Sequence, residues 1–205
     1  MMRFLSQMLT LSAIALVACA GASRAELEGT FEPIGPVPPP HSVEQVQLEE
    51  FLNFTCPHCN NFRTLSKPLL AKYGKRIRHV DVPILFRGQA EDPLRLYYVA
   101  AKAGRGDEVK ELIFDATFRY GVNIYDPKTV GYIARSAGLA AQFEAEGNAE
   151  WVNAKIREAH QRADQVGVEA TPTIVLNGTL RLVPRSNMQS FVENLDRLIA
   201  QLLKP

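Results

Sequence analysis

The chain has 205 residues, which is enough for one domain or for one domain with a sizeable insertion. Its 23 basic and 22 acidic residues leave a formal net charge of +1, and the sequence contains no basic stripe. Nucleic acid is therefore not expected as a partner, and the apolar fraction of 46% is that of an ordinary globular protein.

The first 25 residues have the pattern of an export signal. Arg3 supplies a short positive region, and the apolar run Leu9–Ala18 that follows is too short to span a bilayer comfortably. Ser23-Arg24-Ala25 is a small-x-small cleavage site, which predicts a signal peptide over residues 1–25.

The signal also contains a second possible processing site. Leu16-Val17-Ala18-Cys19 resembles a bacterial lipobox, which predicts a lipoprotein signal over residues 1–18 and lipidation of Cys19. If cleavage follows Ala25 instead, Cys19 is a small apolar residue in a discarded peptide. Both alternatives place the mature domain outside the cytoplasm, in the periplasm, where disulfides persist. The domain is then either soluble or lipid-anchored through Cys19.

Residues 26–42 are dominated by prolines, five in seventeen residues. This composition favours an extended linker over a folded element. We therefore expect the folded domain to begin near Val43 and to continue to residue 204.

Two cysteines stand three apart where a strand is expected to give way to a helix. Val46–Phe54 is apolar enough for a buried strand, and Pro57 is a favoured first residue of a helix. Cys56 then lies at the helix N-terminus, where unpaired N–H groups and the helix dipole favour a thiolate. Cys59 lies one turn deeper on the same face, so we expect it to be shielded and to act as the resolving thiol. His58 is expected to add positive charge or a hydrogen-bond donor near the Cys56 sulfur.

The cysteine pair favours redox chemistry over its two structural alternatives. A structural disulfide that closes so small a loop stabilises little. A zinc site needs about four ligands. The sequence offers neither a second Cys pair nor a His pair at ligand spacing, and Cys19 is the only other cysteine. We therefore expect a catalytic pair and no metal at these sulfurs.

The middle of the chain predicts an α/β order with a large helical block. Pro68 is expected to end or kink the helix after the cysteines, and Ile77–Leu85 alternates as a second strand. Helical patterns then fill an insertion over about residues 93–166. Caps and apolar periodicity define its segments as Leu94–Ala103, Asp107–Phe118 with Asp107 as its cap, Asp126–Ser136 with Asp126 as its cap, and about 149–166.

Strand character returns after the helical block. Thr173–Leu176 and Thr179–Val183 flank Asn177-Gly178, which is a strong signal for a type I′ hairpin. A final amphipathic helix is expected after Ser186 or Asn187, either of which can cap it. The order is β-α-β, helical insertion, β-β-α.

Pro172 stands at the mouth of the hairpin strand, where proline is unusual. One interpretation is an ordinary residue at the start of a strand. The other is a cis Thr171–Pro172 bond, which would leave the Thr171 backbone N–H and C=O free to pair with an extended peptide beside Cys56.

The Cys-Pro-His-Cys motif, the helical insertion and the Thr-Pro before a hairpin together resemble the DsbA family of thioredoxin-fold thiol:disulfide oxidoreductases. The resemblance covers about residues 43–204 and implies a thioredoxin fold interrupted by a helical domain. It implies that Cys56 is the attacked and attacking cysteine, that Cys59 resolves, and that Pro172 is the cis-proline. Glu50, six residues before Cys56, matches a buried acid that takes and returns the Cys59 proton. As an alternative, the strand register turns Glu50 outward as ordinary surface.

Three features depart from the family's pattern. Arg63 stands where a second acidic residue is expected, and no lysine partner for Glu50 is evident. Thr171 before the proline is more typical of the isomerase and reductase relatives. These departures bear on the oxidising strength of the cysteine pair rather than on its chemistry.

The resemblance implies an enzyme that introduces disulfide bonds into reduced exported proteins. It further implies a monomer, reoxidation by a DsbB-type membrane oxidase, and neither a metal nor an organic cofactor. Two alternatives stay open. One is a disulfide isomerase or reductase, which Thr171 favours, although residues 26–42 are too short for the dimerisation region of known isomerases. The other is a metal- or peptide-binding module on a thioredoxin scaffold.

Overall fold

The computed structural model describes residues 26–184 and 187–205. The predicted signal peptide, the candidate lipidation site Cys19 and the candidate cap Ser186 lie outside the described residues. Within the described part of the chain, no helix has the length and apolar character needed to cross a bilayer.

A mixed five-stranded sheet lies at the centre of the fold. Its strands are β1 (Glu32–Pro33), β2 (Val46–Leu52), β3 (Ile77–Pro83), β4 (Thr173–Leu176) and β5 (Leu180–Leu182). They lie in the order β1-β5-β4-β2-β3, with β2 parallel to β3 and β4 antiparallel to both β2 and β5. Asn177 and Gly178 make the tight turn between β4 and β5 with positive φ angles of 49° and 73°, as the sequence predicts.

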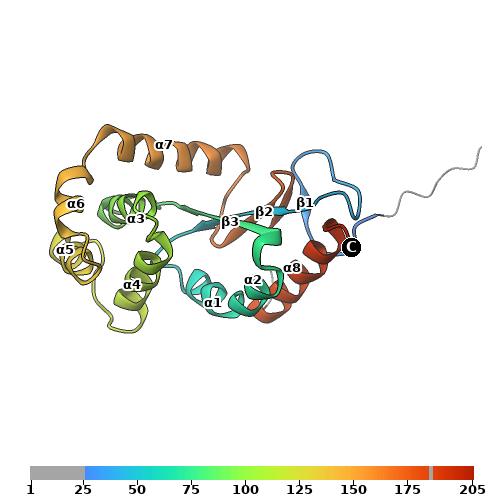
Figure 1. Cartoon of the computed structure of the whole chain (residues 1–205), viewed down its shortest axis with the longest axis horizontal. Coiled ribbons are helices and arrows are strands. Elements are labelled where there is room, and N and C mark those ends of the chain that lie inside the picture. Colours follow the sequence, from blue (N-terminus) through green and yellow to red (C-terminus); the bar gives the residue numbers. More distant parts are fainter. Residues whose placement is uncertain (1–25, 185–186) are drawn as a thin grey trace, which may run out of the picture.

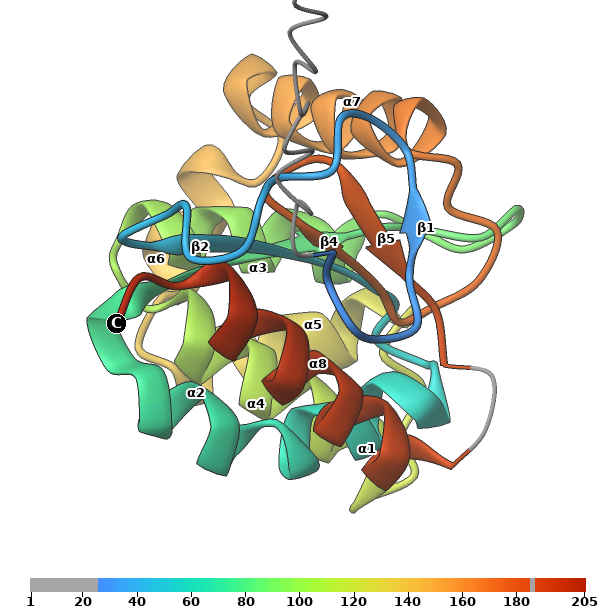
Figure 2. The ribbon, with the colours of Figure 1, turned by 90° about the vertical axis from the view of Figure 1, so that its right-hand side faces the viewer.

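Helices cover both faces of this sheet (Figure 1). They are α1 (Pro57–Leu65), α2 (Lys67–Tyr73) with a following 3-10 turn (Gly74–Arg76), α7 (Glu150–Gln165) and α8 (Met188–Leu202). Figure 2 shows α1, α2 and α8 on one face and α7 across the other. The break between α1 and α2 falls where Pro68 predicts it, because a proline is tolerated in the first turn of a helix but not in its interior. Asn187 caps α8 through its side chain.

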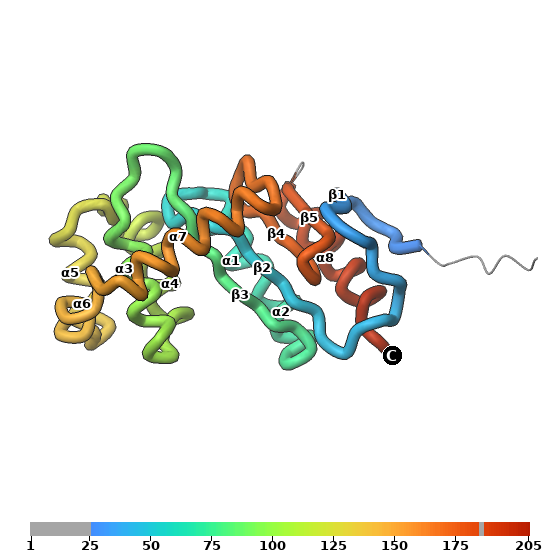
Figure 3. The backbone as a smooth tube through the Cα atoms, turned by 90° about the horizontal axis from the view of Figure 1, so that it is seen from above, coloured from blue at the N-terminus to red at the C-terminus, as the bar shows by residue number. Residues whose placement is uncertain are grey.

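The helical insertion gathers at the end of the molecule opposite to the C-terminus (Figure 3). Its helices are α3 (Asp92–Lys102), α4 (Gly106–Phe118), α5 (Pro127–Ser136) and the short α6 (Ala140–Glu146), after which α7 returns to the sheet. Asp126 caps α5 as predicted. The predicted cap of α4 is wrong: Arg105 holds the cap position and Asp107 lies in the first turn, where a carboxylate still favours the helix dipole.

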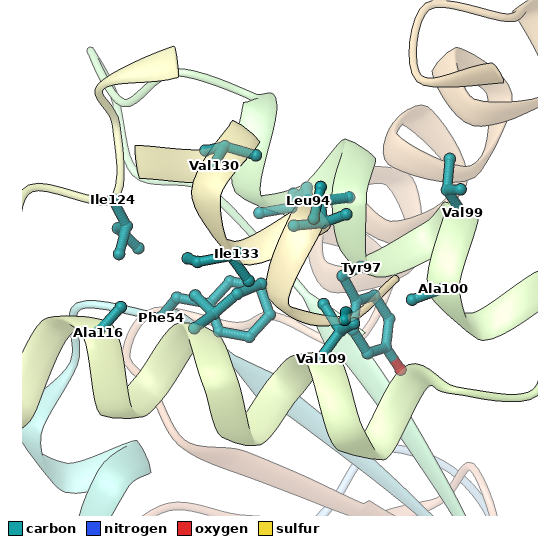
Figure 4. Close-up of a cluster of buried hydrophobic side chains, with 14 of the residues drawn as sticks. Phe54, Leu94, Tyr97, Val99, Ala100, Val109, Ala116, Ile124, Val130 and Ile133 are labelled. Atoms are coloured by element: carbon teal, nitrogen blue, oxygen red, sulfur yellow. The ribbon is translucent and has the colours of Figure 1, made fainter. Parts of the chain in front are cut away.

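Phe54 joins the active-site end of the sheet to the insertion. Its ring packs edge-on against Phe114 of α4, with 5.4 Å between the ring centres, and lies 6.1 Å from the ring of Tyr97 of α3. Figure 4 shows Phe54 among apolar side chains of α3, α4 and α5. Cys59 belongs to the same buried cluster, so the sulfur of the second cysteine has an apolar environment.

Residues 26–42 do not form the free linker that their prolines predict. β1 pairs with β5 and adds an antiparallel edge strand to the sheet. The Glu28 N–H donates to the side chain of Gln201 on α8 (2.7 Å), and the Thr30 N–H donates to Asn194 on the same helix (2.8 Å). Prolines favour an extended backbone and suit an edge strand. The side chains that fix this backbone to the domain come from far along the sequence, so composition does not reveal them.

Candidate active site

Cys56 occupies the N-cap position of α1, with Pro57 as the first helical residue. The Cys56 backbone is extended (φ −83°, ψ 117°), and its Sγ accepts a 3.4 Å hydrogen bond from the Cys59 N–H. Both cysteines are free thiols, Cys56 partly exposed and Cys59 fully buried. The turn from strand to helix therefore leaves one sulfur open to a partner and shields the other.

The loop before β4 lies beside Cys56, although its residue Thr171 comes 115 positions after Cys56 in the sequence. The Thr171–Pro172 peptide bond is cis, as the family resemblance implies. The Thr171 carbonyl oxygen accepts a 3.1 Å hydrogen bond from Cys56 Sγ. Pairing of β4 with β2, in which Thr173 faces Phe51, brings the two segments together.

The pKa values of the two thiols are driven apart. The pKa of Cys56 falls to about 5, first because the Cys59 thiol donates a hydrogen bond to its sulfur, and this outweighs the opposing effect of burial. A side-chain hydrogen bond with Thr171 and the N–H groups of Cys59 and His58 lower it further. Burial raises the pKa of Cys59, and the neighbouring Cys56 sulfur adds to that rise. The pair thus combines a ready thiolate with a thiol that keeps its proton.

His58 contributes to this pattern through its backbone. Its side chain is exposed, and what His58 adds to the lowering of the Cys56 pKa, after the larger contributions of Cys59 and Thr171, comes from its backbone N–H. A position in the first turn of the helix directs this N–H towards the cap residue.

Replacing His58 by proline should raise the pKa of Cys56 more than replacing it by serine. Proline removes the backbone N–H, whereas serine keeps it and removes only the imidazole. Ultraviolet titration of the thiolate in the two reduced variants measures the difference. Equal rises in both variants would assign the effect to the charge of the imidazole instead.

A polar network holds the loop in front of Cys56, and sequence reasoning does not find it. The buried Asn53 side-chain oxygen accepts hydrogen bonds from the N–H and the hydroxyl of Thr55 (3.0 and 2.7 Å), and its amide donates to Gln89 (2.7 Å). The Thr55 hydroxyl also lies 3.3 Å from the hydroxyl of Tyr125. The only signal in the sequence is a polar residue, Asn53, within an otherwise apolar strand end.

Glu50 faces the interior rather than the surface and is 3% exposed. Its Oε2 lies 2.9 Å from Nε2 of His79 on β3. Asp81 on the same strand accepts a 2.6 Å hydrogen bond from Lys110 of α4. Burial raises the pKa of the Glu50 carboxyl. The positive or proton-donating groups around Glu50 are therefore His79 and Lys110, and within the described part of the chain Glu50 makes no hydrogen bond to the Cys59 sulfur.

Arg63, which stands where the resemblance expects an acid, ties α1 to α4. Its guanidinium pairs with Glu111 (2.9 Å) and with Asp115 (3.0 Å), and lies 5.3 Å from the ring centre of Phe114. The acids that complete these pairs lie on α4. Through these ion pairs Arg63 links the thioredoxin part of the fold to the helical insertion.

The chain matches the family model of the DSBA-like thioredoxin domain over residues 47–196. It belongs to this family. Among relatives of this DSBA-like protein, the thiol:disulfide interchange protein DsbA of Bordetella parapertussis is 25% identical over 201 residues, which cover 95% of this chain and 96% of the relative. DsbA of Haemophilus influenzae is 26% identical over 167 residues, with 78% and 80% covered.

Solved structures of the family agree with the fold of this DSBA-like protein. The oxidoreductase DsbA of Xylella fastidiosa superposes with a TM-score of 0.68 at 26% identity, covering 83% of this chain and 90% of that one. DsbA of Pseudomonas aeruginosa gives 0.70 at 20% identity, with 83% and 91% covered, which is a likeness of fold alone. Together with its Cys-x-x-Cys pair, these findings make the chain a thiol:disulfide oxidoreductase of thioredoxin fold with a helical insertion.

Proposed function

We propose that the protein is a dithiol oxidase that introduces disulfide bonds into reduced exported proteins in the periplasm. The arrangement of the pair carries the proposal: the partly exposed Cys56 sulfur, at the N-cap of α1, accepts a 3.4 Å hydrogen bond from the Cys59 N–H, and the pKa of Cys56 falls to about 5 while burial raises the pKa of Cys59. A thiolate that is stable in the reduced protein favours reduction of the Cys56–Cys59 disulfide. Reduction of the enzyme is oxidation of its substrate.

The reaction follows thiol–disulfide exchange. A substrate thiolate attacks Cys56 in the oxidised enzyme, because Cys56 is the exposed sulfur. The bond between Cys56 and Cys59 breaks as the mixed disulfide forms, and Cys59 leaves and takes up a proton. The second substrate thiolate then attacks the substrate sulfur of the mixed disulfide, and Cys56 leaves as a thiolate. The substrate loses two electrons and the enzyme gains them.

The loop at Thr171 and Pro172 is the proposed docking point for the substrate chain. The Thr171 carbonyl lies next to Cys56, so an extended peptide that pairs with this backbone has its own cysteine beside the attacking sulfur. Main-chain pairing of this kind does not depend on the side chains of the substrate, which suits an enzyme with many substrates. Exchange of the Cys59 proton with Glu50 stays a prediction of the resemblance.

The proposed cycle needs an electron acceptor, because each turnover leaves the enzyme as a dithiol. We expect a DsbB-type membrane oxidase in this role, and a monomeric enzyme that works either free in the periplasm or anchored through Cys19. A disulfide isomerase or reductase is the second candidate, and Thr171 before the cis-proline favours it.

Redox equilibrium with glutathione tests the proposal and separates the two candidates. We expect the Cys56–Cys59 pair to be reduced at glutathione ratios that leave ordinary structural disulfides oxidised. The oxidised protein should also oxidise a peptide with two reduced cysteines faster than it rearranges a scrambled disulfide protein. An equilibrium like that of a structural disulfide, or faster rearrangement than oxidation, would contradict the oxidase. Cys56→Ser is the inactive control.

A further inference from the structure

We propose that Glu50, His79 and Asp81 form a binding site for a divalent transition-metal ion, with Zn²⁺ as the best match. The three residues lie on neighbouring parallel strands: Glu50 of β2 pairs in register with Asp81 of β3, and His79 precedes Asp81 by two residues. Residues two apart on a strand point to the same face, so all three side chains converge. One ligand atom from each lies within 4.8 Å of the others.

The separations between these atoms suit one shared cation. Glu50 Oε2 lies 2.9 Å from His79 Nε2, and His79 Nε2 lies 3.4 Å from Asp81 Oδ1. Zinc binds nitrogen and carboxylate oxygen at about 2.0–2.2 Å, so two ligands of a tetrahedral ion are about 3.4 Å apart. The His79–Asp81 separation already has that value, and Glu50 Oε2 and His79 Nε2 would move apart by about 0.5 Å to reach it.

Asp81 carries the second observation. Its side chain is 6% exposed, and its buried Oδ1 makes no hydrogen bond in the described part of the chain; its one charged neighbour is His79 Nε2, 3.4 Å away. A buried polar atom without a hydrogen bond is costly and uncommon in folded proteins. The other oxygen, Oδ2, is held by Lys110 at 2.6 Å, which orients the carboxylate and leaves Oδ1 aimed at His79.

The donor set and the surroundings favour zinc over a harder cation. An imidazole with two carboxylates is a set that Zn²⁺ accepts, whereas Mg²⁺ prefers oxygen ligands only. His79 must present Nε2 without its proton, so the ion takes the place that a proton holds between His79 and Glu50. A cavity of about 360 Å³ borders Glu50, His79 and Lys110 but not Asp81, so solvent can reach two of the three ligands.

Calorimetric titration of the oxidised protein with zinc tests the site. Because Cys56 and Cys59 are joined in a disulfide in that form, their sulfurs do not compete for the ion. We expect one zinc ion per chain, and a loss of affinity of at least about tenfold in His79→Ala. His160→Ala, which removes a partly exposed histidine on α7, is the matched control and should bind as the wild type does.

Thermal unfolding of the oxidised wild type gives a readout that needs no variant. Zinc should raise its Tm, because an ion that binds only the folded chain stabilises it, and Mg²⁺ at the same concentration should not. The site is wrong if the oxidised wild type shows no saturable one-to-one binding, or if His79→Ala and His160→Ala bind zinc equally. The measurement uses the disulfide form without turnover, so its outcome is independent of the proposed function.

Discussion

Cys59→Ala should cause the protein to accumulate in mixed disulfides with exported proteins. Cys59 is the buried thiol beside Cys56, and these two are the only free cysteines in the described part of the chain. Without Cys59 the enzyme cannot form its own disulfide, and the Cys56 thiolate instead attacks partner disulfides, whose second sulfur leaves as a thiolate. No Cys59 thiol is then present to attack the Cys56 sulfur and release the partner. Turnover should fall to the uncatalysed rate, and most of the variant should run on non-reducing gels as complexes that a reductant dissolves.

The control for this experiment is the pair of variants Cys56→Ala and Cys56→Ala/Cys59→Ala. Neither retains the exposed sulfur, so neither should form complexes. If Cys56→Ala captures partners and Cys59→Ala does not, the roles of the two cysteines are the reverse of those proposed.

The thiolate of Cys56 should form with a midpoint near pH 5 in the reduced protein. At pH 7, a pKa of about 5 leaves about 99% of the thiol ionised, against about 3% for an ordinary cysteine. Because a depressed pKa means that the anion is present above it, alkylation by iodoacetamide should be fast and nearly constant from about pH 6 to 8. Its rate should fall as the pH drops through 5.

Cys59→Ser and Cys59→Ala form a matched pair for the cause of this shift. The hydrogen bond from the Cys59 side chain is the largest single contribution to the low pKa of Cys56. Serine keeps a donor at that position and should keep the midpoint low, whereas alanine removes the donor and should move the midpoint upwards. A wild-type midpoint near 8.5–9 would remove the basis for an oxidising disulfide.

Local patterns were sufficient to predict the reactive centre. The spacing of Cys56 and Cys59 after an apolar strand defines the helix N-terminus, and Pro172 before a strand marks a position where a cis bond is one of two interpretations, which the family resemblance favours. Both features depend on residues that are adjacent in the sequence, so the backbone conformations open to them can be derived from the sequence itself. The two halves of the site then come together through the pairing of β2 with β4.

Contacts between residues that are distant in the sequence could not be predicted. Glu50 meets His79 29 residues later, and Arg63 meets Asp115 52 residues later. The contacts of Lys110 likewise follow only once α4 is packed against the sheet. A charged residue in a sequence indicates what it can bind but not which element will face it, so the buried cluster and the ion pairs of Arg63 required the three-dimensional arrangement. The prediction of a free linker over residues 26–42 was wrong for the same reason, because the composition of this segment does not show which elements it contacts.

The position of residues 26–42 constrains the order in which the chain can be assembled. Glu28, Thr30 and β1 find their partners on α8 and β5, 149–173 residues further on. A growing chain presents this segment before β5 and α8, so its docking surface exists only once those later elements have been synthesised. Closing so long a loop is entropically costly and slow compared with local helix formation. Residues 26–42 therefore dock late in folding, although they precede the rest of the domain in the sequence. Until they dock, the outer edge of β5 stays unpaired.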